Sequence, residues 1–300
     1  MSETVGVIGT GVLGSAIAVV LVESGFEVVG YDIDPAKLAA LGERGVKAAT
    51  SAREVADRAA TIVTCLPSVE AMHDAVSGAD GIVAATGAEH IVIETSTVPI
   101  AEKERARDDL AAVGKTMLDC PVSGNRILAL KKKLTAFGSG DRAAYDKVEH
   151  VIRGFAGTTH YIGPFGDGLK MKFVGNILNL VHNSVAAEAM VLGMKSGLDP
   201  RLIHSVISGS GSSSGMFEVR GAMMAENDYR AEGMNFSVPL KDAPIIAAHA
   251  AAHRCPIPIY QAALQPYYAA VAQGRGDEDA SAVCAALELA ANVTREKDGR

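Results

Sequence analysis

The feature that most constrains the fold is a glycine pattern near the start of the chain, Gly9-x-Gly11-x-x-Gly14. An apolar, β-branched run precedes it at 4–9, and an apolar stretch with helical character follows it. In that context the first glycine permits a tight turn, the second lets a pyrophosphate approach the backbone, and the third lets a helix pack on a sheet. Unpaired N–H groups at the start of the helix then attract the phosphates. The pattern predicts a dinucleotide site on a strand–turn–helix unit.

The end of the second strand-like run indicates which dinucleotide is bound. Asp32 closes the run at 26–32, where a carboxylate accepts both ribose hydroxyls and repels a 2′-phosphate. No Lys or Arg follows immediately, because the next residues are Ile33, Asp34 and Pro35, so NAD is predicted over NADP. The cofactor contacts expected in this region are Gly9, Thr10, Gly11, Val12, Leu13, Gly14 and Asp32.

The pattern of predicted secondary structure changes about halfway along the chain. Short β-branched runs alternate with Ala-rich helical stretches at first, which predicts βα units and a parallel sheet. The strand-like runs lie at 4–9, 26–32, 60–66, 90–96, 115–120, 133–138 and about 159–162, with a further helix at 141–153. Helical patterns then dominate, at 167–196, 199–208, 241–253, 257–273 and 279–293, with a flexible loop expected at 209–215. We expect an α/β Rossmann-type domain with a parallel sheet at 1–163 and an all-α domain at 164–300.

Bulk properties restrict the partners and the compartment. A formal net charge of -7 argues against nucleic acid or an anionic membrane as the main partner. The apolar stretch at 173–187 is interrupted by Asn and His side chains, so a core helix fits better than a membrane span. No secretion signal is expected, because the N-terminus runs directly into a strand. Four scattered cysteines without a CxxC pair predict reduced thiols in a cytoplasmic protein, with no metal site: Cys65, Cys120, Cys255 and Cys284.

A lysine and an asparagine early in the second half suggest the chemistry. Lys172 and Asn176 are four residues apart, and on a helix they lie about 40° apart around the axis. Lys170 would lie about 120° from Asn176, on another face. A cation that can lose its proton, beside a fixed amide and downstream of a dinucleotide site, predicts proton transfer coupled to hydride transfer. Lys172 is therefore the acid/base candidate.

These motifs together resemble the β-hydroxyacid dehydrogenase family, which includes 3-hydroxyisobutyrate dehydrogenase, tartronate semialdehyde reductase and, more distantly, 6-phosphogluconate dehydrogenase. The resemblance covers almost the whole chain. Its ordered motifs are GVIGTGVLG (6–14), Leu66-Pro67, Glu94-Thr-Ser-Thr97, Asp119-Cys-Pro-Val-Ser-Gly124, Gly166-x-Gly168, Lys172-x-x-x-Asn176, Leu240-Lys241-Asp242 and Gly276-Asp-Glu-Asp279.

The resemblance implies roles for particular residues. Lys172 would be catalytic and Asn176 would orient the substrate. Ser123 and Gly124 would hold the substrate carboxylate, since a hydroxyl and exposed N–H groups suit an anion. The residues that would approach the nicotinamide half of the cofactor are Leu66, Pro67, Thr97 and Lys241. Without the resemblance, Ser123 also fits a structural turn and Lys241 an exposed surface lysine. The resemblance further implies a homodimer or homotetramer.

The chain departs from the family pattern around the expected substrate turn. Asn125 stands where a second glycine is usual, and its side chain would intrude on the substrate or bind it. Leu128 and Lys132 also replace glycines, and Gly175 precedes Asn176 where Asn is common. The Lys131–Lys133 run is expected to be a solvated loop, or else to attract a more anionic substrate. A larger or more anionic hydroxy acid therefore stays open as the substrate.

The chemistry expected is that of an NAD-dependent 3-hydroxyacid dehydrogenase, or of the corresponding aldehyde reductase. A free lysine has a pKa of about 10.4, so it is neutral in roughly one molecule in 2,500 at pH 7. Burial and the positive nicotinamide would lower the pKa of Lys172 for oxidation, whereas reduction uses the protonated form. No metal is needed. Imine reduction and a non-catalytic NAD-binding module are the alternatives, although relatives of both kinds generally lack the lysine.

Overall fold

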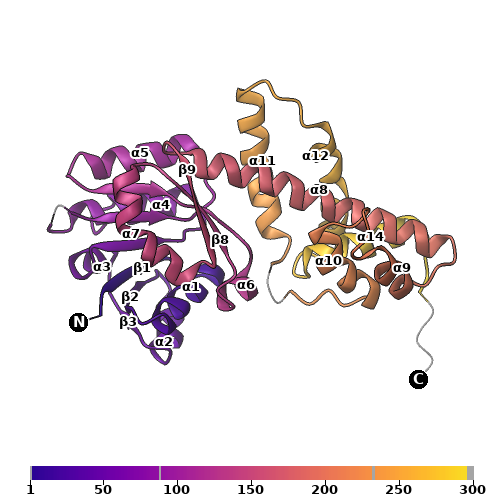
Figure 1. The fold of residues 1–300 in the computed structure, drawn as a ribbon, viewed down its shortest axis with the longest axis horizontal. Helices are drawn as coiled ribbons and strands as arrows, with labels where there is room; N and C mark the ends of the chain where they lie inside the picture. Colours follow the sequence, from indigo (N-terminus) through magenta and orange to yellow (C-terminus); the bar gives the residue numbers. More distant parts are fainter. Residues whose placement is uncertain (1, 88, 232–233, 296–300) are drawn as a thin grey trace. The chain divides into compact units, whose positions relative to one another are not determined.

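The computed structural model describes residues 2–87, 89–231 and 234–295. The chain forms two compact units, Met1–Phe173 (unit 1) and Val174–Arg300 (unit 2). Helix α8 (Asp167–Lys195), labelled in Figure 1, contains the boundary between the two units in the sequence. The expected domain boundary at 163/164 lies just before this helix and stays a prediction.

Unit 1 is built on a sheet of nine strands within the residues that the structure describes. Its order is β3-β2-β1-β4-β5-β6-β8-β7, and β9 pairs with β8. The first six strands are parallel, whereas β8 is antiparallel to both β6 and β7. The strands are β1 (Thr4–Ile8), β2 (Glu27–Tyr31), β3 (Val46–Ala48), β4 (Thr61–Thr64), β5 (Ile91–Glu94), β6 (Thr116–Asp119), β7 (Val122–Ser123), β8 (Thr135–Ser139) and β9 (Thr158–Gly163).

Helices cover both faces of this sheet (Figure 1). On one face the apolar side chains of α1 (Val12–Glu23), α6 (Arg126–Leu130) and α7 (Arg142–Phe155) pack into one core cluster. On the other face, α3 (Ala52–Arg58), α4 (Val69–Ser77) and α5 (Ile100–Ala111) pack into a second cluster with the short helix η1 (Ile82–Ala84). Helix α2 (Pro35–Gly42) contributes Leu41 to the first cluster. The Rossmann-type fold with a mainly parallel sheet is confirmed.

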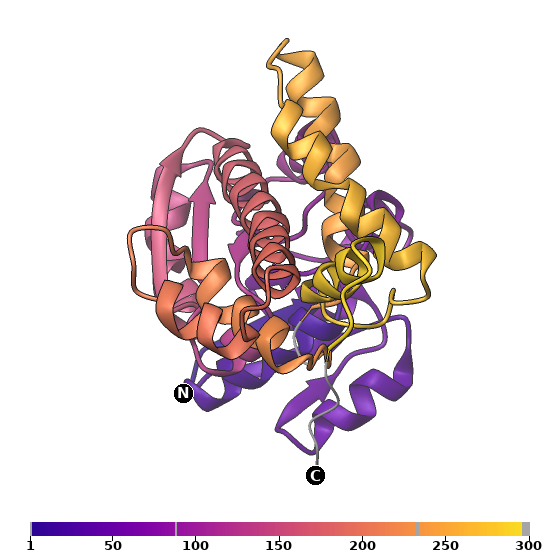
Figure 2. The same ribbon diagram turned by 90° about the vertical axis from the view of Figure 1, so that its right-hand side faces the viewer.

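Unit 2 consists of helices in its described part, drawn from rose-red through orange to yellow in Figure 2. After α8 they are α9 (Pro200–Ile207), α10 (Gly215–Glu226), α11 (Ser237–Ala252), α12 (Pro258–Ala263), α13 (Gln265–Ala272), η2 (Ala280–Ala282) and α14 (Val283–Ala290). The all-α second half is therefore confirmed. Helix α10 was not expected, and the single helix expected at 257–273 is two helices, because a proline stands in the first turn of α13.

Helix α8 is long and apolar enough, by length and composition, to cross a membrane. Polar groups on it are nevertheless buried and bonded within unit 2. The Asn183 amide donates to Tyr267 Oη at 2.7 Å and to the Ala280 carbonyl at 3.0 Å. The Ser184 hydroxyl donates to the Ala263 carbonyl at 2.8 Å. Buried side-chain donors that are bonded in this way are typical of a helix in a protein core.

Candidate functional site

The three glycines of the nucleotide turn stand in three different environments. Gly9 has a φ of +86°, and a Cβ there would lie 2.3 Å from the Cys65 carbonyl oxygen. A Cβ on Gly14 would lie 1.9 Å from the Gly9 carbonyl oxygen, so only glycine lets α1 begin this close to β1. Gly11 faces open space, with no atom within 4 Å of an added Cβ. This arrangement leaves room for a phosphate beside the backbone of Gly11.

The first turn of α1 is suited to an anion. Gly11 is the N-cap, no side chain caps the helix, and its first turn carries no acidic residue. Val12 is 67% exposed, so this turn faces solvent, while Leu13 packs against the core behind it. Unpaired N–H groups together with the helix dipole make such an end a phosphate site.

The Asp32 carboxylate is oriented by several donors at the end of β2. It accepts hydrogen bonds from the Thr10 N–H at 2.7 Å and from the Asp34 N–H at 3.0 Å. Burial raises the pKa of Asp32. The N–H groups of Asp34 and Thr10 and the Lys37 ammonium together lower it by more, so the pKa is below its ordinary value. Lys37 Nζ lies 3.4 Å from Asp32 Oδ1, a neighbour that sequence reasoning did not consider because it comes from α2.

The turns after β4 and β5 lie against each other. Leu66 and Pro67 follow β4, and the Leu66 N–H donates to the Ser96 hydroxyl at 2.8 Å. Ser96 and the buried Thr97 belong to the turn after β5. The structure therefore brings together three of the residues expected near the nicotinamide, with Ser96 as the link. Sequence reasoning quoted Ser96 within a motif but gave it no role.

Lys172 lies beside the turn that was predicted to hold a carboxylate. Its ammonium donates to the Val122 carbonyl oxygen at 2.6 Å, and that carbonyl belongs to the peptide joining Val122 to Ser123. Gly124 follows with a φ of +129°, and a Cβ there would meet Leu134 at 2.6 Å. Lys170, by contrast, is exposed and paired with Asp167 at 2.8 Å, as expected of a solvated neighbour.

Asn125 has a structural use that its position in the sequence did not reveal. It is the N-cap of α6, and its Oδ1 accepts a hydrogen bond from the Leu128 N–H at 3.0 Å. The oxygen of the Asn125 amide is therefore used to cap the helix. The Lys131–Lys133 loop that follows is exposed, as a solvated loop should be.

Unit 2 contains a second group of expected site residues. The Asn176 amide donates to Asp242 Oδ2 at 2.9 Å, and Lys241 Nζ lies 3.0 Å from Asp242 Oδ1. Asp242 is buried, with only 3% of its surface exposed. Lys241 lies in the second turn of α11 and not at its start, because the helix begins at Ser237. Asp242 was not singled out as a site residue, although its motif contains an acid next to the expected lysine.

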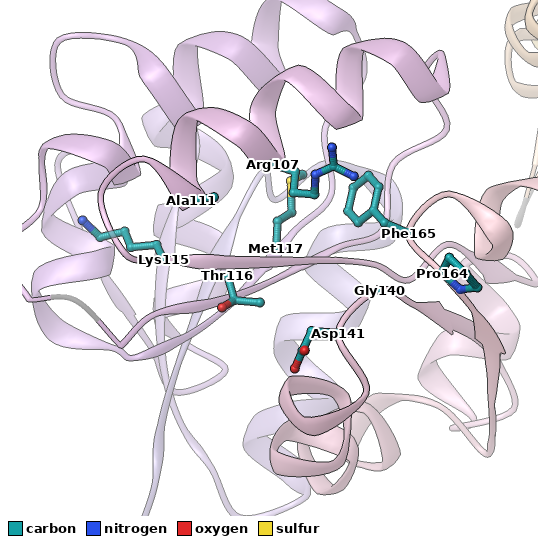
Figure 3. A pocket seen from close by; sticks show the side chains of 9 residues that line it. All are labelled: Arg107, Ala111, Lys115, Thr116, Met117, Gly140, Asp141, Pro164 and Phe165. Carbon is teal, nitrogen blue, oxygen red and sulfur yellow. The ribbon is translucent and has the colours of Figure 1, made fainter.

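A pocket of about 400 Å³ lies away from all of these residues (Figure 3). It opens toward the amino end of β6, whereas Rossmann-type sheets bind ligands outside the carboxyl ends of their strands. The Arg107 guanidinium stands 4.9 Å from the centre of the Phe165 ring in this pocket. The lining residues are Arg107, Ala111, Lys115, Thr116, Met117, Gly140, Asp141, Pro164 and Phe165.

Comparison with known proteins gives consistent matches along the chain. Residues 4–163 match the model for the NAD binding domain of 6-phosphogluconate dehydrogenase. Residues 166–287 match the model for the NAD-binding region of NADP-dependent 3-hydroxyisobutyrate dehydrogenase.

Similar proteins include two curated enzymes and a crystal structure. An L-threonate dehydrogenase of Cupriavidus necator is 34% identical over 284 residues, which are 94% of this chain and 95% of that protein. Mitochondrial 3-hydroxyisobutyrate dehydrogenase of Mus musculus is 30% identical over 287 residues, covering 93% of this chain and 85% of that protein. The crystal structure of a 3-hydroxyisobutyrate dehydrogenase from Salmonella typhimurium is 29% identical, with a TM-score of 0.83 and coverage of 95% of this chain and 99% of that chain.

Proposed function

The chain belongs to the β-hydroxyacid dehydrogenase family, and on this premise we propose Lys172 as its acid/base residue and a small 3-hydroxy acid as its substrate. It is a dehydrogenase of hydroxy acids that uses NAD, as its sequence motifs predicted. The alternatives of an imine reductase and a non-catalytic module are not favoured by these relatives. The observation that carries the proposal is the contact of 2.6 Å between Lys172 Nζ and the Val122 carbonyl, next to Ser123.

The proposed chemistry separates a proton from a hydride. When NAD is bound, it supplies the acceptor for the hydride that leaves the carbinol carbon with both bonding electrons. Neutral Lys172 takes the hydroxyl proton as the carbonyl forms, and in reduction the ammonium returns that proton to the alkoxide. The Val122 carbonyl accepts an N–H bond from Lys172, which fixes the direction of the side chain.

Substrate binding is proposed for Ser123, Gly124, Asn125 and Asn176. The Ser123 hydroxyl and the backbone at Gly124 suit a carboxylate, and they adjoin the Val122 carbonyl that Lys172 contacts. Asp242 holds the Asn176 NH₂ group, so Asn176 Oδ1 remains to accept a substrate hydroxyl. The Asn125 NH₂ group favours a substrate with an additional oxygen over a purely aliphatic one.

The cofactor half of the site is proposed to comprise the nucleotide turn, Asp32, Leu66, Pro67, Thr97 and Lys241. The open space at Gly11 and the uncapped start of α1 support binding of the pyrophosphate. The oriented Asp32 carboxylate supports recognition of the ribose hydroxyls of NAD. We further propose 1–163 as the cofactor domain and 164–300 as the helical domain, limits close to those of the two matching family regions.

Two further proposals concern the whole protein. Apolar side chains on the unit 2 part of α8 are at least half exposed, which supports a homodimer or homotetramer that covers them: Val174, Leu178, Val185 and Leu192. Cys120 and Cys284 are buried thiols, which supports a cytoplasmic location.

A substrate screen tests the proposal. The rate of NADH formation is measured with 3-hydroxyisobutyrate, L-threonate and 2-(hydroxymethyl)glutarate, each with NAD and with NADP. We expect NAD to be preferred, and the two singly charged acids to have higher kcat/KM than the doubly charged one. Because Asn125 offers an additional donor, we expect L-threonate to exceed 3-hydroxyisobutyrate. Absence of turnover with every acid of this class would refute the proposed substrate.

A further inference from the structure

A row of buried polar side chains crosses the carboxyl ends of four strands in unit 1. Thr64 pairs in register with Glu94, Glu94 with Asp119, and Asp119 with Ser139. All four residues are fully buried. Carboxylates are almost never buried unless they are paired. The two carboxylates of this row therefore need a buried cation nearby.

Lys103 of α5 provides the cation. It is fully buried, and its Nζ lies 2.7 Å from Asp119 Oδ1 and 3.8 Å from Glu94 Oε1. Two carboxylates and one ammonium leave this cluster negative by one charge when all are ionised. The remaining negative charge is therefore stabilised by backbone and hydroxyl hydrogen-bond donors. These donors belong to the start of α8 and to the turn after β5.

One end of the row holds the start of α8. Asp119 Oδ2 accepts a hydrogen bond from the Leu169 N–H at 2.8 Å, and the Ser139 hydroxyl oxygen accepts one from the Gly168 N–H at 3.0 Å. These N–H groups lie in the first turn of α8, where a negative charge is stabilised by the helix dipole. A Cβ on Gly168 would lie 2.2 Å from the Phe137 carbonyl oxygen, so the glycine permits this approach.

The other end of the row holds the turn after β5. Glu94 Oε1 accepts a hydrogen bond from the Ser96 N–H at 2.6 Å, and Thr64 donates to the other Glu94 oxygen. Ser96 in turn accepts the N–H of Leu66 at 2.8 Å. The same buried row thus fixes the turns proposed for the nicotinamide and the helix that carries Lys172 one turn later.

We infer that Asp119, Ser139 and Lys103 are positioning residues that set the place of Lys172 through the first turn of α8. They do not contact the reacting atoms; they fix the backbone from which the lysine projects, while Val122, in the same Asp119–Gly124 segment, fixes its nitrogen. The inference rests on the proposed role of Lys172. It predicts an effect on the chemical step that loss of stability alone would not produce.

The test compares Ser139→Ala and Asp119→Asn with a control, Tyr145→Phe. Tyr145 is also buried in unit 1, and its hydroxyl bonds Thr159 Oγ1 at 2.6 Å, outside the row. We measure thermal stability, NADH affinity, the KM for the hydroxy acid, kcat and the pH profile of kcat. For both row variants we expect kcat to fall about 10- to 100-fold, since a shift of about 1 Å in a reacting group costs that much. We also expect a displaced pH profile, with KM and NADH affinity within about twofold of wild type.

The control should lose stability with an unchanged kcat and pH profile. The inference is overturned when folded Ser139→Ala protein keeps kcat within about twofold of wild type, or when Tyr145→Phe lowers kcat as much. Ser139→Ala retains the Asp119–Lys103 pair, so it decides the question even when Asp119→Asn fails to fold. An inactive Lys172→Ala with a fully active Ser139→Ala refutes only the positioning role, whereas an active Lys172→Ala refutes the proposed function itself.

Discussion

At the scale of single residues, the glycines of the nucleotide turn differ in what surrounds them. Gly14 is confined by the backbone of Gly9, so its role is to let the helix approach the strand. Gly11 is confined by nothing in the protein and has an ordinary φ of -62°, which alanine also adopts. The space at Gly11 is therefore not used for packing, and we propose that the cofactor phosphates occupy it.

Replacing each of these two glycines by alanine should separate folding from cofactor binding. Gly11→Ala is expected to keep wild-type thermal stability and to weaken NADH binding, because a methyl group enters the phosphate space. Steric overlap of this kind costs about 1–3 kcal/mol, or roughly 5- to 150-fold in Kd. Gly14→Ala should instead lower the melting temperature of the free protein. Thermal scans and NADH titration measure both effects, and equal behaviour of the two variants would contradict the assignment.

The lowered pKa of Asp32 leads to a prediction about acid. Burial raises the pKa of Asp32, but the Asp34 and Thr10 N–H groups and Lys37 outweigh it, so the folded-state value is below the unfolded one. The carboxylate therefore contributes stability above its unfolded pKa of about 3.9, and loses it as the pH falls through the lower folded value. In urea unfolding, the advantage of wild type over Asp32→Asn should be constant above about pH 5 and shrink below about pH 4. An advantage that grows on acidification would be incompatible with this account.

At the residue scale, local geometry let the sequence distinguish side chains that lie on different faces of one helix, while the role given to Lys172 stays a prediction. Helical spacing alone selected Lys172 over Lys170, and the structure places Lys172 against Val122 and Lys170 on the surface. Asp242 was not selected as a site residue, because its contact with Asn176 joins two helices that lie far apart in the sequence. The helix-capping use of Asn125 also depends on where the next helix begins.

At the scale of elements, α8 combines an apolar composition with internal polar anchors. Asn183 is fully buried, and its amide bonds Tyr267 and the carbonyl of Ala280. These contacts fix the rotation of α8 within unit 2, since turning the helix would break both hydrogen bonds of the buried NH₂ group. Apolar periodicity by itself could not specify that rotation.

Removing the Asn183 anchor should destabilise the protein. Asn183→Ala leaves the Ala280 carbonyl without its donor in a buried place, a loss of about 1–3 kcal/mol in the free energy of unfolding. Glu188→Ala, at an exposed position on the same helix, is the matched control and should change it by less than about 0.5 kcal/mol. Urea unfolding of the three proteins measures the difference. Indistinguishable stabilities for Asn183→Ala and wild type would show that the anchor contributes nothing.

The long elements were predictable from sequence and the short ones were not. Each expected strand-like run overlaps a strand, because β-branched residues bounded by turn formers give a clear pattern. Strands β3 and β7 have three and two residues, too few for a period to be visible. The reversed direction of β8 was also missed, since composition carries no information on strand direction. Helix α10 was missed because the segment expected to be a flexible loop, 209–215, contains its N-cap, Ser214, and its first residue, Gly215.

At the scale of the whole molecule, the exposed apolar side chains of α8 support the proposed homo-oligomer. Leu178 and Val185 are 50% and 53% exposed and seven residues apart, so they lie on the same side of the helix. Soluble proteins seldom leave contiguous apolar surface of this kind open to water. A second copy of the chain is the occupant we propose.

Charged substitutions on this face of α8 should dissociate the oligomer into smaller species. Light scattering during size-exclusion chromatography is expected to give the mass of a dimer or tetramer for wild type. The Leu178→Lys/Val185→Lys double variant should have a smaller mass, because each lysine would have to be desolvated in the interface. Val113→Lys, at a partly exposed position in unit 1, is the control and should leave the mass unchanged. A monomeric wild type, or a double variant of unchanged mass, would refute this interface.

The central claim is that Lys172 transfers the proton while NAD takes the hydride. The most direct measurement is kcat for a hydroxy acid together with NADH affinity, in Lys172→Ala and in Lys170→Ala. We predict that Lys172→Ala lowers kcat by about 10²- to 10⁴-fold with NADH affinity nearly unchanged, and that Lys170→Ala stays close to wild type. Lys172→Ala protein that retains more than a few percent of the wild-type kcat would contradict the claim.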